Sequence, residues 1–287
     1  KTREELDRDG MMLSSANSIN WGRLAPQIAY YVSAYCDMVK GGAVEMGEKI
    51  NICVPTGNFG NILAAYIAKR MGLPVNKLIC ASNRNNVLTD FFKKGGAYDR
   101  NRDFYTTTSP SMDILISSNL ERLLLHTSGS AEKVEGWMQE LAATGKYTVD
   151  AETLAKIQAS FAAGYADDAA GAAEIRARFE RDGYLCDTHT AVAVKVYRDY
   201  VAQTGDDLPT VIDSTASPYK FSKSVLTAVL EGNTPQLDEF DMVEELHRIT
   251  GAAVPAPLAA LKDKAVRFTQ VCDRENMSQM VFQLLNL

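Results

Sequence analysis

The loop at residues 56–61 has the composition of an anion-binding site. It reads Thr-Gly-Asn-Phe-Gly-Asn, follows an apolar run at residues 51–55, and precedes an apolar-periodic stretch that begins at Ile62. A helix that starts after such a loop has first-turn N–H groups without partners inside the helix, and its dipole favours negative charge. We expect Gly57 and Gly60 to take left-handed backbone angles and to let a ligand approach closely. The pattern G-x-x-G alone fits phosphate binding and an ordinary turn equally well.

A second polar cluster lies at the start of a predicted helix. Asn17, Ser18 and Asn20 are followed by Arg23 and then by residues 24–40, which are rich in Ala, Tyr and Val and predict a buried helix. A hydroxyl, amides and a guanidinium fork that converge at a helix start suit a phosphate or a carboxylate. Because Ser and Asn also cap helices, a capping loop is the alternative.

Two later segments are rich in hydroxyl groups. Residues 105–113 read Tyr-Thr-Thr-Thr-Ser-Pro-Ser-Met-Asp and precede a predicted helix at residues 114–125. Ser214, Thr215 and Ser217 follow a predicted strand at residues 210–213. A surface loop is the default interpretation of the first segment, and a ligand-facing role is the alternative.

Asp187 and Thr188 offer a cap for a long helix through Tyr200, and His189 lies beside them. A histidine in such a turn fits a catalytic role, but a structural role is more common.

The elements that must position these residues form an alternating pattern. Strands are predicted at residues 51–55 and 77–82, and helices at residues 62–70 and 87–92. This order predicts an α/β fold, a parallel sheet with crossover helices, in which ligands bind beyond the carboxyl ends of the strands.

Residues 131–180 show helical patterns and no strand pattern, which predicts an inserted helical lobe. We therefore expect three parts, at residues 1–130, 131–182 and 183–287.

Composition excludes several classes of protein. The chain has 287 residues, a formal net charge of −6 and 23% charged residues, so it lacks the basic clustering of nucleic-acid-binding proteins. No stretch approaches the roughly 20 apolar residues of a membrane span, and no signal peptide is visible. The five cysteines are scattered without a C-x-x-C pair, which favours buried thiols, a cytoplasmic location and no structural zinc.

Taken together, these segments resemble the threonine synthase family. The resemblance covers nearly the whole chain and places it in the C-terminal two-thirds of that family's sequence. Five ordered motifs at matching spacing are more specific than any one alone. They are Asn-Ser-Ile-Asn-Trp-Gly-Arg at residues 17–23, Pro-Thr-Gly-Asn-Phe-Gly-Asn at 55–61, the loop with Thr107, Ser109, Met112 and Asp113, Asp-Thr-His-Thr-Ala-Val-Ala at 187–193, and Ser-Thr-Ala-Ser-Pro-Tyr-Lys-Phe at 214–221.

The resemblance implies a fold, a cofactor and a substrate. The family has the tryptophan-synthase β-like fold, fold type II of the pyridoxal 5'-phosphate (PLP) enzymes, and converts O-phospho-L-homoserine and water into L-threonine and phosphate by carbon–oxygen lyase chemistry. It implies that the cofactor is held by Gly57, Asn58, Phe59, Gly60 and Asn61 at its phosphate and by Thr215 at its pyridine nitrogen. It implies that the substrate phosphate is held by Asn17, Ser18 and Arg23.

The resemblance also implies that the catalytic lysine, which forms the Schiff base, lies upstream of Lys1. No lysine here matches that motif, and Lys220 belongs to the last of the five motifs. The chain begins without Met in a charged helical pattern, which favours an internal part of a longer protein over a processed start. Such a part would be inactive alone and would self-associate through exposed apolar surface. A threonine-synthase-like phospho-lyase and a non-catalytic binding module are the alternative functions.

Overall fold

The computed structural model describes residues 2–234 and 236–287. Lys1, where the predicted helical pattern begins, lies outside the described residues. The chain forms two compact units, which are described separately. One consists of Asn17–Val254, and the other combines Lys1–Ala16 with Pro255–Leu287.

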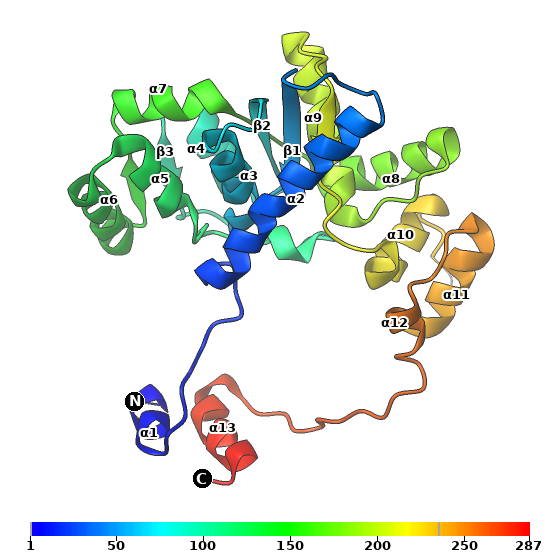
Figure 1. Ribbon diagram of the computed structural model, residues 1–287. Helices are drawn as coiled ribbons and strands as arrows, with labels where there is room; N and C mark the ends of the chain where they lie inside the picture. The colour runs from blue at the N-terminus through cyan, green and yellow to red at the C-terminus, as the bar shows by residue number, and fades with distance from the viewer. Residues whose placement is uncertain (1, 235) are drawn as a thin grey trace. The chain divides into compact units, whose positions relative to one another are not determined.

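The larger unit is built on a parallel sheet in the strand order β5-β2-β1-β6 (Figure 1). The two central strands are β1 (Ile50–Pro55) and β2 (Val75–Ser82), and the flanking strands are β6 (Thr210–Ile212) and β5 (Phe161–Tyr165). The predicted strands at residues 51–55, 77–82 and 210–213 are confirmed. All strands are parallel, so their carboxyl ends lie at one edge of the sheet.

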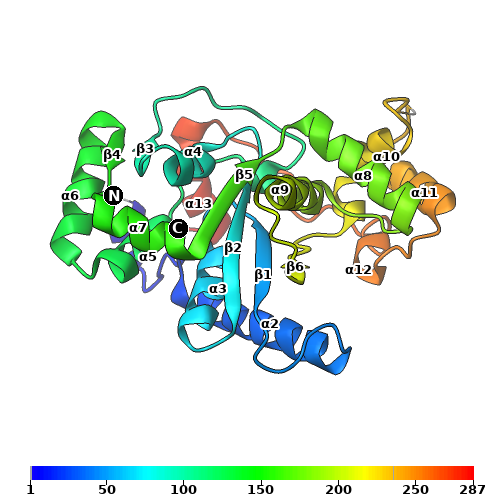
Figure 2. The same ribbon diagram turned by 90° about the horizontal axis from the view of Figure 1, so that it is seen from above.

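Helices cover both faces of the sheet (Figure 2), and alternate residues of a strand point to opposite faces. Ile52 and Val54 pack in the cluster that contains α3 (Gly60–Arg70). Cys53 faces the other way and packs under α9 (Thr188–Thr204). Because both faces are covered, β1 is a continuous apolar run apart from buried Asn51, as expected for a central strand of a parallel sheet.

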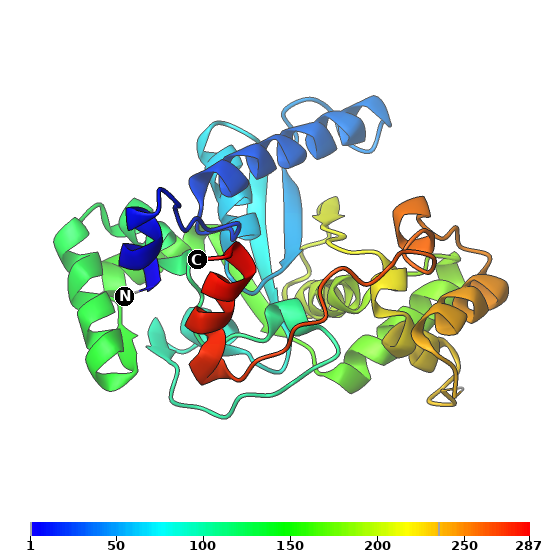
Figure 3. The same cartoon turned by 90° about the horizontal axis from the view of Figure 1, so that it is seen from below.

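Helix α2 (Trp21–Lys40) packs along α3 (Figure 3). Its buried residues are Leu24, Tyr31 and Tyr35, while Tyr30 is 63% exposed. The prediction of a buried helix at residues 24–40 is therefore wrong for one face, since an Ala- and Tyr-rich composition does not by itself show how many sides are covered.

Residues 131–180 contain helices α6 (Ala131–Thr144), α7 (Ala151–Ser160) and most of α8 (Asp168–Asp182). They also contain two strands, so the prediction of a strand-free lobe is wrong. Strand β5 pairs with β2 inside the main sheet, and β4 (Lys146–Thr148) pairs with β3 (Ala97–Asp99). The Ala- and Gly-rich sequence of β5 has little strand propensity of its own, and pairing with β2 determines its conformation.

The larger unit has further elements that pack on the sheet or on other helices. Helix α5 begins six residues later than the predicted helix at residues 114–125, because Ser117 and Asn119 in the preceding segment hydrogen-bond to the loop at residues 56–61. These elements are α4 (Val87–Lys93), α5 (Leu120–Ser128), η1 (Pro110–Met112), η2 (Pro218–Phe221), α10 (Ser222–Val229) and α11 (Glu239–Thr250).

The smaller unit contains short helices: α1 (Thr2–Arg8), α12 (Ala256–Ala259), η3 (Arg274–Asn276) and α13 (Met277–Leu285). The two units divide the chain differently from the three predicted parts. Over residues 2–234 and 236–287, no helix is both long and apolar enough to cross a bilayer. The same residues include no group of three or more metal-ligating side chains.

Two glycines provide a matched test of β5 in the sheet. A Cβ added at Gly164 in β5 would lie 2.8 Å from Cγ1 of Val196 on α9, whereas a Cβ at Gly136 in α6 meets nothing within 4 Å. We expect Gly164→Ala to lower the free energy of unfolding by about 1–3 kcal/mol through overpacking. Gly136→Ala should raise it by about 0.5–1 kcal/mol. Urea denaturation measures both, and equal effects would contradict the packing of β5 against α9.

Candidate functional site

The polar loop lies at the carboxyl end of β1 and leads into α3. Phe59 is the N-cap residue of α3 and has a left-handed φ of 64°. Gly57 and Gly60 do not have positive φ values. The prediction that the glycines supply the left-handed angles is therefore wrong, because Phe59 takes that conformation.

The two glycines are instead required by close contacts within the protein. A Cβ at Gly57 would lie 2.5 Å from the carbonyl oxygen of Ser111, and a Cβ at Gly60 would lie 2.6 Å from Cβ of Ser18. Any side chain at either position would displace a neighbouring segment. The loop is therefore packed between residues far away in the sequence.

The ring of Phe59 is 1% exposed and packs against two other phenylalanines. Its centroid lies 6.2 Å from that of Phe92 and 5.8 Å from that of Phe161. This burial offsets the cost of a left-handed residue with a side chain. Phe59 can therefore contribute only its backbone to a ligand.

The loop turns its carbonyl groups toward the protein. The Asn58 carbonyl accepts hydrogen bonds from the backbone N–H of Asn119 (3.1 Å) and from its side-chain amide (2.9 Å). The Gly57 carbonyl accepts a hydrogen bond from the Ser117 hydroxyl at 2.8 Å. Within the described part of the chain, the backbone N–H groups of residues 57–62 donate no hydrogen bond. This run of donors at a helix start, with a left-handed residue inside it, has the geometry of an anion-binding nest.

The predicted substrate segment reaches this loop through Ser18. The side-chain amide of Asn119 donates to the Ser18 hydroxyl at 3.3 Å, and that hydroxyl donates to the side-chain oxygen of Asn17 at 3.2 Å. Arg122 donates to the Ile19 carbonyl at 2.6 Å. Residues at the start of α5 therefore hold this segment against the loop.

Asn20 caps α2 by accepting a hydrogen bond from the N–H of Gly22 at 2.9 Å, so the capping interpretation holds for this residue. Arg23 lies one turn into α2 with an exposed side chain. The predicted roles of Asn17, Ser18 and Arg23 toward a substrate stay predictions.

Asn61 uses its side chain within the protein. Its amide oxygen accepts a hydrogen bond from Tyr31 on α2, and its amide nitrogen donates to Asp213, which follows β6. Tyr31 also approaches Asp213 at 3.5 Å. Asn61 can therefore serve a ligand through its backbone N–H, while its side chain ties α2, α3 and the end of β6 together.

Burial shifts the pKa values of the two ionisable groups in the buried trio of Tyr31, Asn61 and Asp213. Burial raises the pKa of Asp213, and hydrogen bonds from Asn61 and Tyr31 oppose this shift only in part. Burial together with the nearby Asp213 raises the pKa of Tyr31 well above its usual value. Protonated Asp213 is thus favoured in the folded protein relative to the unfolded chain.

Thr215 lies two residues beyond Asp213, whose N–H donates to the carbonyl of Cys53 in β1 at 2.9 Å. Thr215 is thereby placed at the same sheet edge as the loop. Its side chain is exposed, and its hydroxyl forms no hydrogen bond with any described residue. Its predicted role toward a pyridine nitrogen stays a prediction.

The hydroxyl-rich loop at residues 105–113 forms a wall beside Gly57. The Asp113 carboxylate accepts hydrogen bonds from the side chains of Asn83 (2.7 Å), Asn85 (3.0 Å) and Thr107 (2.7 Å). This network fixes the segment to the carboxyl end of β2. The segment remains partly exposed, as the default interpretation of a surface loop predicts, and its ligand-facing role stays a prediction.

Sequence reasoning missed several residues that build the site. These residues lie outside the hydroxyl- and glycine-rich segments of the sequence: Tyr31, Ser117, Asn119, Arg122 and Asp213. Asp213 was predicted only as the last residue of a strand. Asn119 precedes α5, where an amide is common, but the predicted helix at residues 114–125 placed it inside a helix. The others had no local signal, because their partners lie far away in the sequence.

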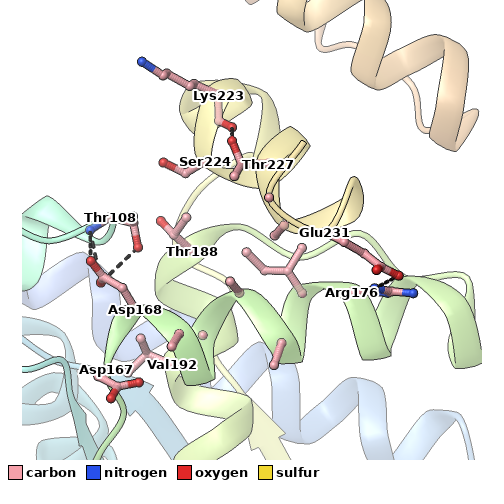
Figure 4. Close-up of a pocket in the computed structure, with 17 residues that line it drawn as sticks. Thr108, Asp167, Asp168, Arg176, Thr188, Val192, Lys223, Ser224, Thr227 and Glu231 are labelled. Atoms are coloured by element: carbon pink, nitrogen blue, oxygen red, sulfur yellow. Dashed lines mark hydrogen bonds and ion pairs between the residues drawn. The ribbon is translucent and has the colours of Figure 1, made fainter. Parts of the chain in front are cut away.

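A separate cavity of about 580 Å³ lies among α8, α9 and α10. Its walls combine small apolar residues, such as Ala172 and Val192, with hydroxyl and charged side chains (Figure 4). At its rim, Asp168 accepts a hydrogen bond from Thr108 and Arg176 pairs with Glu231. The cavity shares no residue with the predicted cofactor or substrate set.

The chain is similar to threonine synthases and to a threonine synthase-like protein. A family model described as "Threonine synthase, C-terminal" matches residues 190–281. Human threonine synthase-like 1 is 44% identical over 221 residues, which cover 77% of this chain and 29% of that protein. Threonine synthase of Saccharomyces cerevisiae is 35% identical over 253 residues, which cover 83% of this chain and 48% of that enzyme.

Among solved structures, PLP-bound threonine synthase from Brucella melitensis matches with a TM-score of 0.79 and 38% identity, over 96% of this chain and 53% of that chain. Yeast threonine synthase matches with a TM-score of 0.79 and 31% identity, over 96% and 55%. The parallel sheet and its helices therefore define the α/β fold of type II PLP enzymes. Within that class, the chain is of the threonine synthase type. It spans about half, and not two-thirds, of the threonine synthases that it matches.

Two aspartates provide a test of the buried trio by pH. The pKa of Asp213 is raised, so its contribution to stability is present at low pH and is lost as pH rises through its folded-state pKa. The stability of the wild type relative to Asp213→Asn should therefore fall as pH rises above about 4. Urea denaturation at a series of pH values measures this difference.

Asp206 is the matched control. Burial alone would raise its pKa, but hydrogen bonds from Tyr200 and Asn51 outweigh burial and lower it. For Asp206 the pH dependence should be reversed. The stability of the wild type relative to Asp206→Asn should fall as the pH decreases below about 4. If the stability difference changed with pH in the same direction for both variants, the raised pKa assigned to buried Asp213 would be contradicted.

Proposed function

We propose that this chain supplies the phosphate-binding edge of a cytoplasmic, PLP-dependent threonine synthase, which converts O-phospho-L-homoserine and water into L-threonine and phosphate. The observation that carries the proposal is the run of N–H groups at residues 57–62, which have no acceptor in the described protein. The similarity to threonine synthases is consistent with the proposal, but the N–H donors are its physical basis.

The residues of the loop fit the phosphate group of PLP. Backbone donors at a helix start favour a dianion, and both glycines lack the Cβ that would push neighbouring segments aside. The carbonyls of Gly57 and Asn58 are already engaged by Ser117 and Asn119, so they do not oppose an anion. The cofactor, when bound, supplies an electron sink for carbanion chemistry.

The cofactor-binding roles divide between backbone and side chain. Gly57, Asn58, Phe59, Gly60 and Asn61 would hold the phosphate with their N–H groups. Thr215 would meet the pyridine nitrogen with a hydroxyl. A hydroxyl does not hold that nitrogen protonated as a carboxylate does, which moderates the cofactor's electron demand.

Asn17, Ser18 and Arg23 would bind the phosphate of the substrate, which is the leaving group of the reaction. The contact of Ser18 with Gly60 supports this assignment, because it brings the substrate segment to the loop. Arg23 would add a bidentate guanidinium, and Asn17 and Ser18 would add neutral hydrogen bonds.

A threonine-synthase-like phospho-lyase is the second candidate. It is favoured by the 44% identity to human threonine synthase-like 1, which exceeds the identity to the yeast threonine synthase. Both candidates release phosphate from O-phospho-L-homoserine. Analysis of the organic product separates them, since threonine forms only in the first.

Gly60→Val tests the cofactor site. The valine side chain would overlap Ser18 and shift the start of α3, so the N–H groups would no longer converge. Each charge-assisted hydrogen bond contributes about 1.5–3 kcal/mol, so PLP affinity should fall about 10- to 100-fold or more. Gly136→Val is the control, because a Cβ added at Gly136 meets nothing within 4 Å. Fluorescence titration with PLP measures the dissociation constant, and equal affinity in the two variants would contradict the assignment.

Arg23→Lys tests the substrate site. Lysine keeps the charge but loses the bidentate fork, so affinity for O-phospho-L-homoserine should fall about 10- to 100-fold while PLP affinity is unchanged. Arg176→Lys, in the separate cavity, is the matched control. Calorimetric titration in the presence of PLP measures both. Loss of PLP affinity with retained substrate affinity would assign this segment to the cofactor or to the core.

A further inference from the structure

His189 is buried at the start of α9 and lies beside a buried carboxylate. Asp187 is 0% exposed and His189 is 3% exposed. Asp187 caps α9 by accepting hydrogen bonds from the N–H groups of His189 (2.8 Å) and Thr190 (3.3 Å). The Nδ1 atom of His189 lies 3.2 Å from the same carboxylate. The carboxylate therefore both caps the helix and orients the ring.

The contacts determine which ring nitrogen carries the proton. The backbone N–H of Ser111 donates to Nε2 of His189 at 3.2 Å. Because a backbone N–H can only donate, Nε2 must be an unprotonated acceptor. The proton therefore lies on Nδ1 and faces Asp187. The ring also packs on Phe221 at a centroid distance of 4.8 Å, which fixes its plane.

Ser111 joins this pair to the glycine loop. Its N–H is held by His189, and its carbonyl oxygen lies 2.5 Å from where a Cβ of Gly57 would be. Residue 111 is thus in contact with the start of α9 through its N–H and with the loop through its carbonyl. A displacement of Ser111 would alter the space next to Gly57.

We propose that His189 is a positioning residue for the Gly57 loop, which acts through the backbone of Ser111 and is itself oriented by Asp187. The proposal rests on the proposed function in one respect, namely that the ligand of the Gly57 loop is PLP. His189 touches neither the loop nor any ligand directly. His189 holds the Ser111 carbonyl so close to residue 57 that only a glycine fits there.

Other anchors of the same segment make the proposal specific. Asn83 and Asn85 fix Asp113, and Asp168 accepts hydrogen bonds from the N–H (3.2 Å) and hydroxyl (3.1 Å) of Thr108. If these anchors sufficed, loss of the His189 acceptor would leave Ser111 in place. The proposal requires that Ser111 moves.

The test uses two matched variants. His189→Gln keeps an acceptor near the position of Nε2, whereas the shorter His189→Asn does not reach Ser111. Hydrogen exchange of peptides that cover residues 105–117 should be roughly 10-fold faster or more in His189→Asn, because one partly buried hydrogen bond is lost, and close to wild type in His189→Gln. His247→Asn, at an exposed histidine of α11, is the control and should not alter this segment.

A double-mutant cycle with Gly57→Ala connects His189 to the loop. In the wild-type background, the added Cβ and the Ser111 carbonyl cannot both keep their positions, so PLP affinity should fall about 10-fold or more. In the His189→Asn background, Ser111 can yield, and the same change should cost at least about threefold less. Additive effects would overturn the proposal, as would unchanged exchange in His189→Asn.

The two readouts separate this proposal from the proposed function. If the wild type does not bind PLP, the proposed function fails, and the exchange measurement still decides whether His189 holds Ser111. If a His189 variant does not fold, exchange in Gly57→Ala alone tests the contact with Ser111. Faster exchange at residues 105–117 supports that contact, and unchanged exchange overturns it.

Discussion

The structure depends on one constraint, the left-handed conformation of Phe59 at the start of α3. This conformation is unfavourable for a residue with a side chain, and the packing of its ring between Phe92 and Phe161 offsets the cost. With the ring fixed in the core, the two residues before Phe59 turn their carbonyls toward Ser117 and Asn119. The N–H groups are left without acceptors, so the hydrophobic core itself creates the anion-binding geometry.

Segments from four parts of the chain meet around this loop. Ser18 contacts Gly60, Ser111 contacts Gly57, Asn119 holds Asn58, and Asp213 holds Asn61. Each contact is made at the carboxyl edge of a parallel sheet, where the crossover connections bring the chain back repeatedly. Side chains in these contacts are small or are amides and carboxylates, because the backbone must approach closely and every buried polar group needs a partner.

The sequence alone predicted the central strands, the crossover helices and the polar segments that meet at the site. Alternating apolar runs and glycine-containing turns are local signals, and β1, β2 and α3 carry them clearly. Prediction from the sequence failed where contacts between distant segments determine the structure. Segment β5 is a strand because it pairs with β2. Helix α2 packs on α3 with one face and leaves Tyr30 on another face exposed. The role predicted for Gly57 and Gly60 was also wrong, because the sequence of the loop does not show that Ser111 and Ser18 lie against these glycines.

The central claim is that backbone N–H groups at residues 57–62 bind the phosphate of PLP. The most direct measurement is a titration of the isotope-labelled chain with PLP, followed by amide chemical shifts, with inorganic phosphate as a competitor. We predict the largest shifts at the amides of Phe59, Gly60 and Asn61, and a weaker apparent affinity for PLP when phosphate is present. Unchanged amides in this loop, or the largest shifts around the cavity between α8 and α10, would contradict it.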